Sequence, residues 1–463
     1  MQKPKITVLG AGSLFFGREA ILGMIKTAGL SKGTLALVDT DPERLDLMLK
    51  LAKMAAEHAG VPLKIEGSTD RRKVLSGSDF VILSFSNRGA YYRGLDCKIS
   101  KKHGIRLSSG DTIGPAGIFK AMRELPEALR AAEDAAELCP KAWLINYINP
   151  VAVIGLALKR HARNRNFSLC DGLGTADKMK NLMCLCGIAD VPGQITGAMI
   201  GKFRVMIEGV NHFNWLLKAE YEGRDILPAL RKTVEKLAEK EMETAAPEKD
   251  PPQGGSKGEF LFTYALCLWD IFGAYPCQIS HTREYVPYFQ REFRHNGRII
   301  PPLNIFNAAG RMKIHEKMWK EVRGYVSGKK NISDFFLHAK IDYAIEVISA
   351  ILNDKKTEYL VNTGNDGVVP DLPKNAFLEL SCDVAADGPR PRPCLPFPAG
   401  GRAMQAKVID AHELTVEAIV RRDRNLLMRA MLTDPLVHSI ETAKGLIEDL
   451  FAAERDAVPS DWR

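Results

Sequence analysis

Short apolar runs alternate with segments of helical periodicity in the first third of the chain. The runs lie within KITVLGAG, TLALVDTD, DFVILSFS and AWLINYINP. Runs of this length bounded by turn residues predict strands, and strands that alternate with helices predict a mostly parallel sheet. The pattern therefore predicts an α/β fold whose N-terminal part is a doubly wound Rossmann sheet.

A glycine turn follows the first run, in GAGSLFFGREAI. Gly10 allows a tight turn and Gly12 lets a pyrophosphate approach the helix start, with Ser13 in the same turn. Phe15 stands where a third glycine is usual, but the second run ends in Asp39, which suits the adenosine ribose hydroxyls and repels a 2′-phosphate. We expect NAD rather than NADP. The alternative is an ordinary α/β turn with Asp39 as a cap.

Two polar residues are expected near the ligand-binding edge of this sheet. Asn149 ends the fourth run directly before Pro150, at a carboxyl edge where such sheets bind ligands. Asp111 precedes a Gly/Pro loop that leads into an amphipathic helical pattern. Asp111 is therefore either a site residue or a simple turn residue.

The pattern changes in the second part of the chain. Residues 175–235 alternate helix-like and strand-like stretches, and 242–258 form a polar loop without apolar periodicity. Residues 359–383 are typical of strands with tight turns, and the rest is helical to the end. We predict an NAD-binding domain over 1–170 and a C-terminal α+β domain over 171–463 for metal and substrate binding and oligomerisation.

Composition narrows the class of protein. The chain has 463 residues, of which 46% are hydrophobic and 26% charged, with a net charge of +8 spread along it. No basic run is interleaved with aromatic residues, so nucleic acid is not an expected partner. No apolar run is long enough to span a membrane. Nine scattered cysteines without a CxxC pair, and an apolar strand that begins at once, favour a cytoplasmic protein with reduced thiols.

Cys170 and His212 are the candidate metal ligands. Both follow strand-like runs near the ligand edge of the sheet, and a thiolate and an imidazole can bind a divalent ion. Their separation of 42 residues is not a diagnostic metal spacing, so a structural cysteine and a core histidine remain the alternative.

Seven motifs together resemble glycoside hydrolase family 4 in order and spacing, from residue 5 to Asp434. They are GAGSLFFGREAI, DTIGPAGIFKAMRELP, INYINPVAV, LCDGLG, GVNHFNWLL, YPCQISHTREYVPYF and NDGVVPDLP. The resemblance implies a fold like that of lactate and malate dehydrogenases. It also implies a glycosidase in which bound NAD⁺ takes a hydride from carbon 3 of the sugar, a base removes the proton on carbon 2, the aglycone leaves by elimination, and the hydride returns.

The resemblance also gives Cys170 and His212 a role as metal ligands. Manganese is the usual ion, although zinc or iron could compete for a thiolate. Open coordination positions are expected to take sugar oxygens and water. Asp171 departs from the His or Asn that commonly follows the metal cysteine, and it is expected to bind a sugar hydroxyl or to orient a ligand.

Three further roles follow from the resemblance. Asp111 matches the acid that protonates the leaving oxygen, and Asn149 matches a residue that touches substrate and cofactor. The carbon 2 base is Asp270, with Tyr264 as the second choice.

The expected substrate is a small-molecule, unphosphorylated α-glycoside of the gluco-, galacto- or uronic type, and the expected assembly is a homodimer or homotetramer. Two alternatives remain open at this point. One is an NAD-dependent 2-hydroxyacid dehydrogenase on the same fold, and the other is a divergent relative that acts on an unusual or anionic glycoside.

Overall fold

The computed structural model describes residues 3–170, 172, 175–244, 260–338, 340–458 and 461–462. Asp171 and most of the predicted 242–258 loop lie outside these residues; positions 242–244 end a helix. Within the described chain, no helix is both long and apolar enough to cross a membrane.

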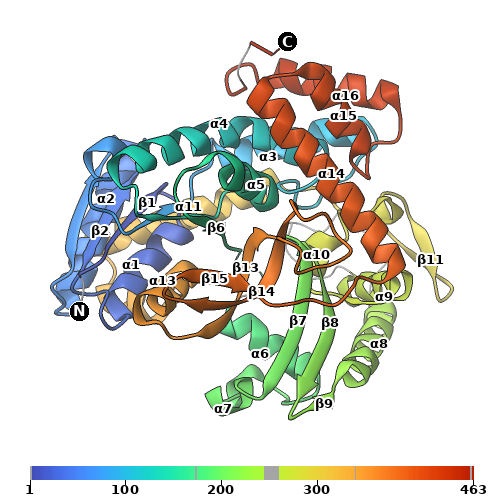
Figure 1. Ribbon diagram of the computed structural model, residues 1–463, viewed down its shortest axis with the longest axis horizontal. Coiled ribbons are helices and arrows are strands. Elements are labelled where there is room, and N and C mark those ends of the chain that lie inside the picture. The colour runs from blue at the N-terminus through green and yellow to red at the C-terminus, as the bar shows by residue number, and fades with distance from the viewer. Residues whose placement is uncertain are drawn as a thin grey trace.

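A parallel sheet forms the N-terminal part of the molecule. Its strands lie in the order β3-β2-β1-β4-β5-β6 and all pair in parallel, so the predicted Rossmann topology is confirmed. Figure 1 shows α4 and α5 on one face and α1 and α13 on the other. The strands are β1 (Lys5–Leu9), β2 (Thr34–Val38), β3 (Lys64–Ser68), β4 (Phe80–Leu83), β5 (Trp143–Asn146) and β6 (Asn166–Ser168).

The first helices of this part begin where the sequence supplies caps and turns. The Asp41 side chain accepts hydrogen bonds from two amides of the first turn of α2, and Pro42 occupies that turn. Gly114 and Pro115 open the long helix that follows Asp111. The helices are α1 (Phe16–Lys26), α2 (Pro42–His58), α3 (Gly89–Lys102), α4 (Gly114–Leu138) and α5 (Val151–His161).

The same sheet continues into the C-terminal part with antiparallel strands. Strand β6 pairs with β13 at Ser168 and Asn362, and the order then runs β13-β14-β7-β8-β10, with β15 on β14 and β9 on β8. The bounds are β7 (Phe203–Val210), β8 (Phe213–Tyr221), β9 (Arg224–Asp225), β10 (Tyr275–Pro276), β13 (Thr357–Gly364), β14 (Phe377–Ala385) and β15 (Gly388–Pro391); β11 (Phe293–His295) and β12 (Arg298–Ile300) form a separate hairpin. The predicted domains therefore share one sheet, and the boundary at residue 170 stays a prediction.

Helices of the C-terminal part cover this sheet and reach back over the N-terminal part. Helix α14 packs on α4 and α5, and α11 packs on α2 and α3. One continuous apolar core joins both parts, and a second cluster lies around α6, α8 and β7–β8. The helices are α6 (Ala176–Leu185), α7 (Gly197–Ile200), α8 (Leu227–Thr244), α9 (Leu261–Phe272), α10 (Ile279–Thr282), α11 (Ala308–Val326), α12 (Ile332–His338), α13 (Tyr343–Asn353), α14 (Ala399–Arg421), α15 (Arg424–Thr433) and α16 (Ile440–Ala453).

Candidate functional site

The glycine turn after β1 is tied to the end of β2 by backbone hydrogen bonds. The amides of Gly10 and Ala11 both donate to the Val38 carbonyl at 2.9 Å. The Gly12 amide donates to Oδ2 of Asp39 at 2.7 Å, and the Asp41 amide donates to Oδ1 of Asp39 at 3.0 Å. The Asp39 carboxylate is thus fixed at the mouth of the turn.

Close approach explains both glycines of this turn. Gly10 has a φ of 93°, and a Cβ there would lie 2.6 Å from the Phe85 backbone. A Cβ on Gly12 would lie 2.7 Å from Oδ2 of Asp39. Side chains are therefore excluded from the place where the sequence predicts a pyrophosphate.

A cavity of about 1130 Å³ opens beside this turn. Gly10, Gly12, Ser13 and Asp39 all line it. Its volume exceeds the range of about 300–1,000 Å³ that is typical of small-molecule sites, so a dinucleotide is a reasonable occupant. The residues predicted to bind the cofactor from the first two runs therefore share one hollow.

Cys170 and His212 meet in the folded chain. Cys170 follows β6, whereas His212 lies in the two-residue turn between β7 and β8. Their Sγ and Nε2 atoms are 3.1 Å apart, and both side chains are buried. Two soft or borderline donors from distant segments thus converge on one point.

The turn that carries His212 is held by α10 and the residues after it. His212 adopts a φ of 64°, and its carbonyl accepts a hydrogen bond of 3.0 Å from Oγ1 of Thr282. The Tyr285 hydroxyl donates to the Asn211 carbonyl at 3.0 Å. The His281 ring stacks on the His212 ring, with centroids 4.1 Å apart. These contacts fix the imidazole toward Cys170.

The Cys170–His212 pair fits a metal ion in its donor chemistry. A zinc ion bound at about 2.3 Å from sulfur and 2.0–2.1 Å from nitrogen would need the two atoms only slightly farther apart than 3.1 Å. Within the described residues no group of three potential metal ligands is found. Nδ1 of His281 is buried and has no hydrogen-bond partner in that part of the chain. The pair alone would leave coordination positions for substrate.

Asp111 lies at the same end of the sheet as Asn149. Its Oδ1 accepts a hydrogen bond of 2.7 Å from Oγ of Ser109, and its Oδ2 lies 3.1 Å from Nη1 of Arg93. Nδ2 of Asn149 reaches Oδ2 of Asp111 at 3.5 Å. Asn149 follows β5 and Cys170 follows β6, its parallel neighbour, so both residues lie at the carboxyl edge of the sheet.

Buried charge shapes this end of the site. Burial raises the pKa of Asp111, but the nearby charge of Arg93 outweighs it and holds this pKa well below its usual range. Burial lowers the pKa of His281 to about 4; the Asp111 charge opposes the shift, and nearby arginines add to it. The structure thus favours an ionised Asp111 and a neutral His281.

Glu284 shapes the loop before Asp111. It is fully buried, and its carboxylate accepts hydrogen bonds from Oγ of Ser108 at 2.6 Å, from the Gly110 amide at 3.3 Å and from the Ser109 amide. The sequence interpretation did not assign Arg93, His281 or Glu284. Of these three residues, only His281 and Glu284 lie in one of the quoted motifs, within HTREY, where they are one helical turn apart.

The two candidates for the carbon 2 base differ in position. The Asp270 side chain is 53% exposed and forms an ion pair of 2.7 Å with Arg231, so the structure does not bring it to the Cys170–His212 pair. Tyr264 is buried, its hydroxyl donates to the Pro301 carbonyl at 2.8 Å, and the Arg283 guanidinium lies 5.3 Å from its ring centroid. Asp171 lies outside the described residues.

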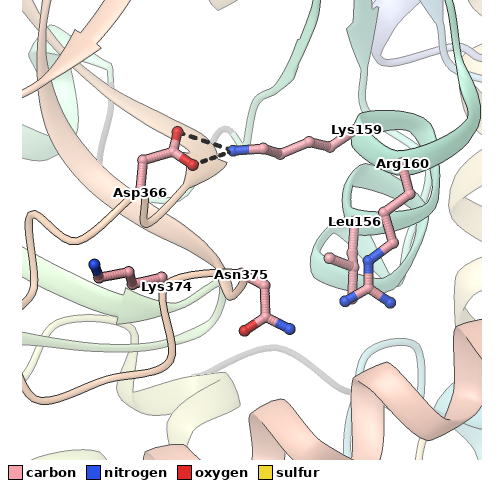
Figure 2. A pocket seen from close by; sticks show the side chains of 6 residues that line it. All are labelled: Leu156, Lys159, Arg160, Asp366, Lys374 and Asn375. Carbon is pink, nitrogen blue, oxygen red and sulfur yellow. Dashed lines mark hydrogen bonds and ion pairs between the residues drawn. The ribbon is translucent and has the colours of Figure 1, made fainter.

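A second hollow, of about 470 Å³, lies against α5 (Figure 2). At its edge, Nζ of Lys159 donates hydrogen bonds to both carboxylate oxygens of Asp366, at 2.7 and 2.9 Å. None of the predicted site residues lines it. The lining residues are Leu156, Lys159, Arg160, Asp366, Lys374 and Asn375.

Comparison with solved structures defines the class of fold. The malate dehydrogenase of Cryptosporidium parvum superposes with a TM-score of 0.51 at 13% identity, covering 91% of this chain and all of that one. A 6-phospho-alpha-glucosidase from gut microorganisms, crystallised in complex with NAD and Mn²⁺, superposes with a TM-score of 0.80 at 19% identity over 99% of both chains. The expected dehydrogenase-like fold is confirmed.

Comparison of sequences gives the family. Residues 5–185 match the model of family 4 glycosyl hydrolases, and residues 207–437 match the model of the family's C-terminal domain. The alpha-galactosidase of Bacillus subtilis (strain 168) is 28% identical over 98% of this chain and 99% of its own length. The chain belongs to family 4 of the glycosyl hydrolases. It is therefore a glycoside hydrolase rather than a 2-hydroxyacid dehydrogenase.

Proposed function

We propose that the protein is an NAD⁺- and divalent-metal-dependent glycosidase for an unphosphorylated α-glycoside of the gluco-, galacto- or uronic type. The observation that carries the proposal is the convergence of Cys170 and His212, 3.1 Å apart, at the sheet edge that also holds Asn149. Similarity to an alpha-galactosidase over nearly the whole chain is the reason for putting an unphosphorylated substrate first; a probable 6-phospho-beta-glucosidase is equally 28% identical, so 6-phosphoglycosides are the competing substrate class.

The cavity beside the glycine turn is the proposed NAD⁺ site. The turn at Gly12 and Ser13 would lie against the pyrophosphate, which the missing Cβ of Gly12 allows, and Asp39 would accept hydrogen bonds from the adenosine ribose. Bound NAD⁺ would supply a hydride acceptor that later returns the hydride. Asn149 and the residues around it would place the sugar at the sheet edge.

Cys170 and His212 would hold the metal, which is Mn²⁺ or another divalent ion. When bound, the ion would attract sugar hydroxyl oxygens and favour their ionised form. The protein's contribution is to fix both donors: the His281 ring and the Thr282 hydroxyl hold His212 in place, and burial keeps bulk water from the sulfur.

Asp111 is the proposed acid for the leaving oxygen. Arg93 keeps it ionised in the free protein, so this role requires that substrate binding weaken the Arg93 contact and let Asp111 take up a proton. For the carbon 2 base we prefer Tyr264 to Asp270, because Tyr264 is buried under Arg283, whose charge also reaches His281.

Charge near the site bears on the type of sugar. The charges of Arg93, Arg283 and Arg311 all lower the pKa of His281. A uronic carboxylate is the one anionic group among the proposed sugars that such positive charge would complement.

A panel of nitrophenyl α-glucoside, α-galactoside and α-galacturonide, with their 6-phosphorylated and β counterparts, tests the proposal. NAD⁺, Mn²⁺ and a reductant must be present. Hydrolysis of an unphosphorylated α-glycoside that stops after NAD⁺ and metal are removed supports it. Turnover of 6-phosphoglycosides alone, or full turnover without both cofactors, contradicts it.

A further inference from the structure

Helix α11 of the C-terminal part forms one wall of the large cavity. The glycine turn and Asp39 line the cavity, and so do His315, Trp319 and Arg323 of α11. Helix α11 packs on α2 and α3 of the N-terminal part, although it lies far along the chain from the strands that carry the turn (Figure 1). The predicted dinucleotide site is therefore enclosed by both parts of the molecule.

Two flat groups meet near the Asp39 end of the cavity. Trp319 is buried, and the guanidinium carbon of Arg44 lies 5.6 Å from its ring centroid. Arg44 belongs to α2 and also pairs with Asp41, Nε to Oδ2, at 3.1 Å. A Cβ on Gly12 would lie 3.3 Å from Cβ of Arg44, so this pair adjoins the glycine turn.

A purine base would find a matching surface at this place. Asp39 marks the position expected for the adenosine ribose, and adenine lies next to that ribose in the cofactor. Bases stack on aromatic rings and on arginine guanidinium planes. We propose that Trp319 and Arg44 form the adenine-binding surface of this protein, so that α11 holds the cofactor against the N-terminal sheet.

Contacts with two N-terminal helices hold α11 in place. Nη1 of Arg18 on α1 lies 3.5 Å from Oε2 of Glu321 on α11. A Cβ on Gly94 of α3 would lie 2.4 Å from Cβ of Ala308 at the start of α11. Such close packing leaves the helix little room to swing away from the cavity.

The inference rests on the proposed function because it takes NAD⁺ as the cofactor. The new element is that the C-terminal part contributes binding energy for NAD⁺. A tightly held cofactor suits a reaction in which the cofactor is regenerated in each cycle. Binding rather than turnover is therefore the decisive measurement.

Titration of the metal-free protein with NAD⁺ by calorimetry tests the inference. Trp319→Ala should weaken binding about 5- to 150-fold, the range expected for loss of one stacked base. Lys320→Gln, on the next and exposed position of α11, should bind like the wild type. Circular dichroism and the Tm of the cofactor-free variants check that both are folded.

Trp319→Phe gives a second reading, because phenylalanine keeps a flat ring on which a base can stack. This variant should keep most of the affinity for NAD⁺ that Trp319→Ala loses, and Trp269→Phe, on α9 against Tyr275, should bind like the wild type. A Kd within twofold of the wild type in folded Trp319→Ala, or a loss in Trp319→Phe as large as in Trp319→Ala, would overturn the stacking role of α11 and leave the proposed function intact. A wild type that does not bind NAD⁺ would overturn both.

Discussion

The dinucleotide end and the metal end of the site are built in different ways. At the first, backbone amides and Asp39 from one local strand-helix-strand unit define the turn. At the second, Asp111, Cys170, His212 and His281 come from four distant segments and lie among buried charges. The first end depends mainly on backbone shape, whereas the second depends on particular side chains.

This difference predicts unequal sensitivity to substitution. Side-chain changes at the metal end remove a reacting or metal-binding group, so their effects on turnover should be large. Changes at the dinucleotide end alter the fit of a cofactor that contacts many groups, so they should weaken binding without abolishing it. Three substitutions, taken from the largest expected effect to the smallest, test this comparison.

Asp111→Ala should have the largest effect, and only on demanding substrates. General acid help is worth about 10²–10⁴-fold, and a good leaving group departs without it. We expect that loss in kcat/KM for alkyl glycosides and near-normal turnover of activated nitrophenyl glycosides. Deuterium from the solvent should still enter carbon 2 of the product. Equal losses on both substrate types would instead assign Asp111 to holding Arg93, and Arg93→Gln should then show the same pattern.

Cys170→Ser should cost activity and metal together. Loss of partners that only orient a ligand lowers affinity 10–100-fold, so loss of the ligand itself should lower metal affinity at least about 100-fold. The variant should stay folded because the hydroxyl fits the buried space. Metal content by mass spectrometry and turnover with added Mn²⁺ measure the effect. Cys139→Ser is the control, because Cys139 is also buried but lies before the first residue of β5, away from the carboxyl edge of the sheet. Full metal retention by Cys170→Ser would make this cysteine structural.

Gly12→Ala should have a smaller effect, confined to the affinity for NAD⁺. The new Cβ would press on Oδ2 of Asp39 and shift the carboxylate proposed to bind the ribose, and loss of a hydrogen bond to a charged group costs about 1.5–3 kcal/mol. The Kd for NAD⁺ should rise about 10- to 150-fold while kcat at saturating NAD⁺ changes little. Gly197→Ala, at a position with open space, is the matched control. A collapse of kcat at saturating cofactor would show that the two ends are less separable than the structure indicates.

The same difference between the two ends explains which features of the structure could be predicted from the sequence. Strand runs, the glycine turn and Asp39 lie close together in sequence, so periodicity and turn chemistry predicted them, and the Rossmann sheet is confirmed. The continuation of that sheet through Ser168 and Asn362 was not predicted, because pairing between residues this distant leaves no local pattern. Arg93 and His281 were missed for the same reason, since only the fold brings them to Asp111 and His212. Asp270 was chosen from the resemblance as an acid beyond the metal histidine, and its exposure is a property of helix packing that the sequence does not show.

Buried charge in the C-terminal part also allows a comparison of two glutamates on paired strands. Glu208 of β7 lies opposite Leu380, and Glu379 of β14 lies opposite Gly209. The carboxylate of Glu379 accepts amide hydrogen bonds from Gln278 at 3.0 Å, from Asn362 at 3.2 Å and from Asn214. Within the described chain, only the Cys394 thiol, a weak donor, acts as a hydrogen-bond partner for Glu208.

Burial raises the pKa of both carboxyls to about 7, so each contributes most stability when protonated and loses that contribution as the pH rises from about 4.5 through 7. Glu208→Gln removes this loss without breaking an amide contact. The variant should match the wild type near pH 5 and exceed its free energy of unfolding by up to about 3 kcal/mol near pH 8. Glu379→Gln should be destabilised by about 1–3 kcal/mol near pH 5, because one amide donor would then face others, and this deficit should shrink near pH 8, where the wild type loses stability as Glu379 ionises. Urea unfolding at the two pH values measures both, and a Glu208→Gln variant that is less stable than the wild type at pH 8 would show that this carboxylate has a partner that stabilises its charge.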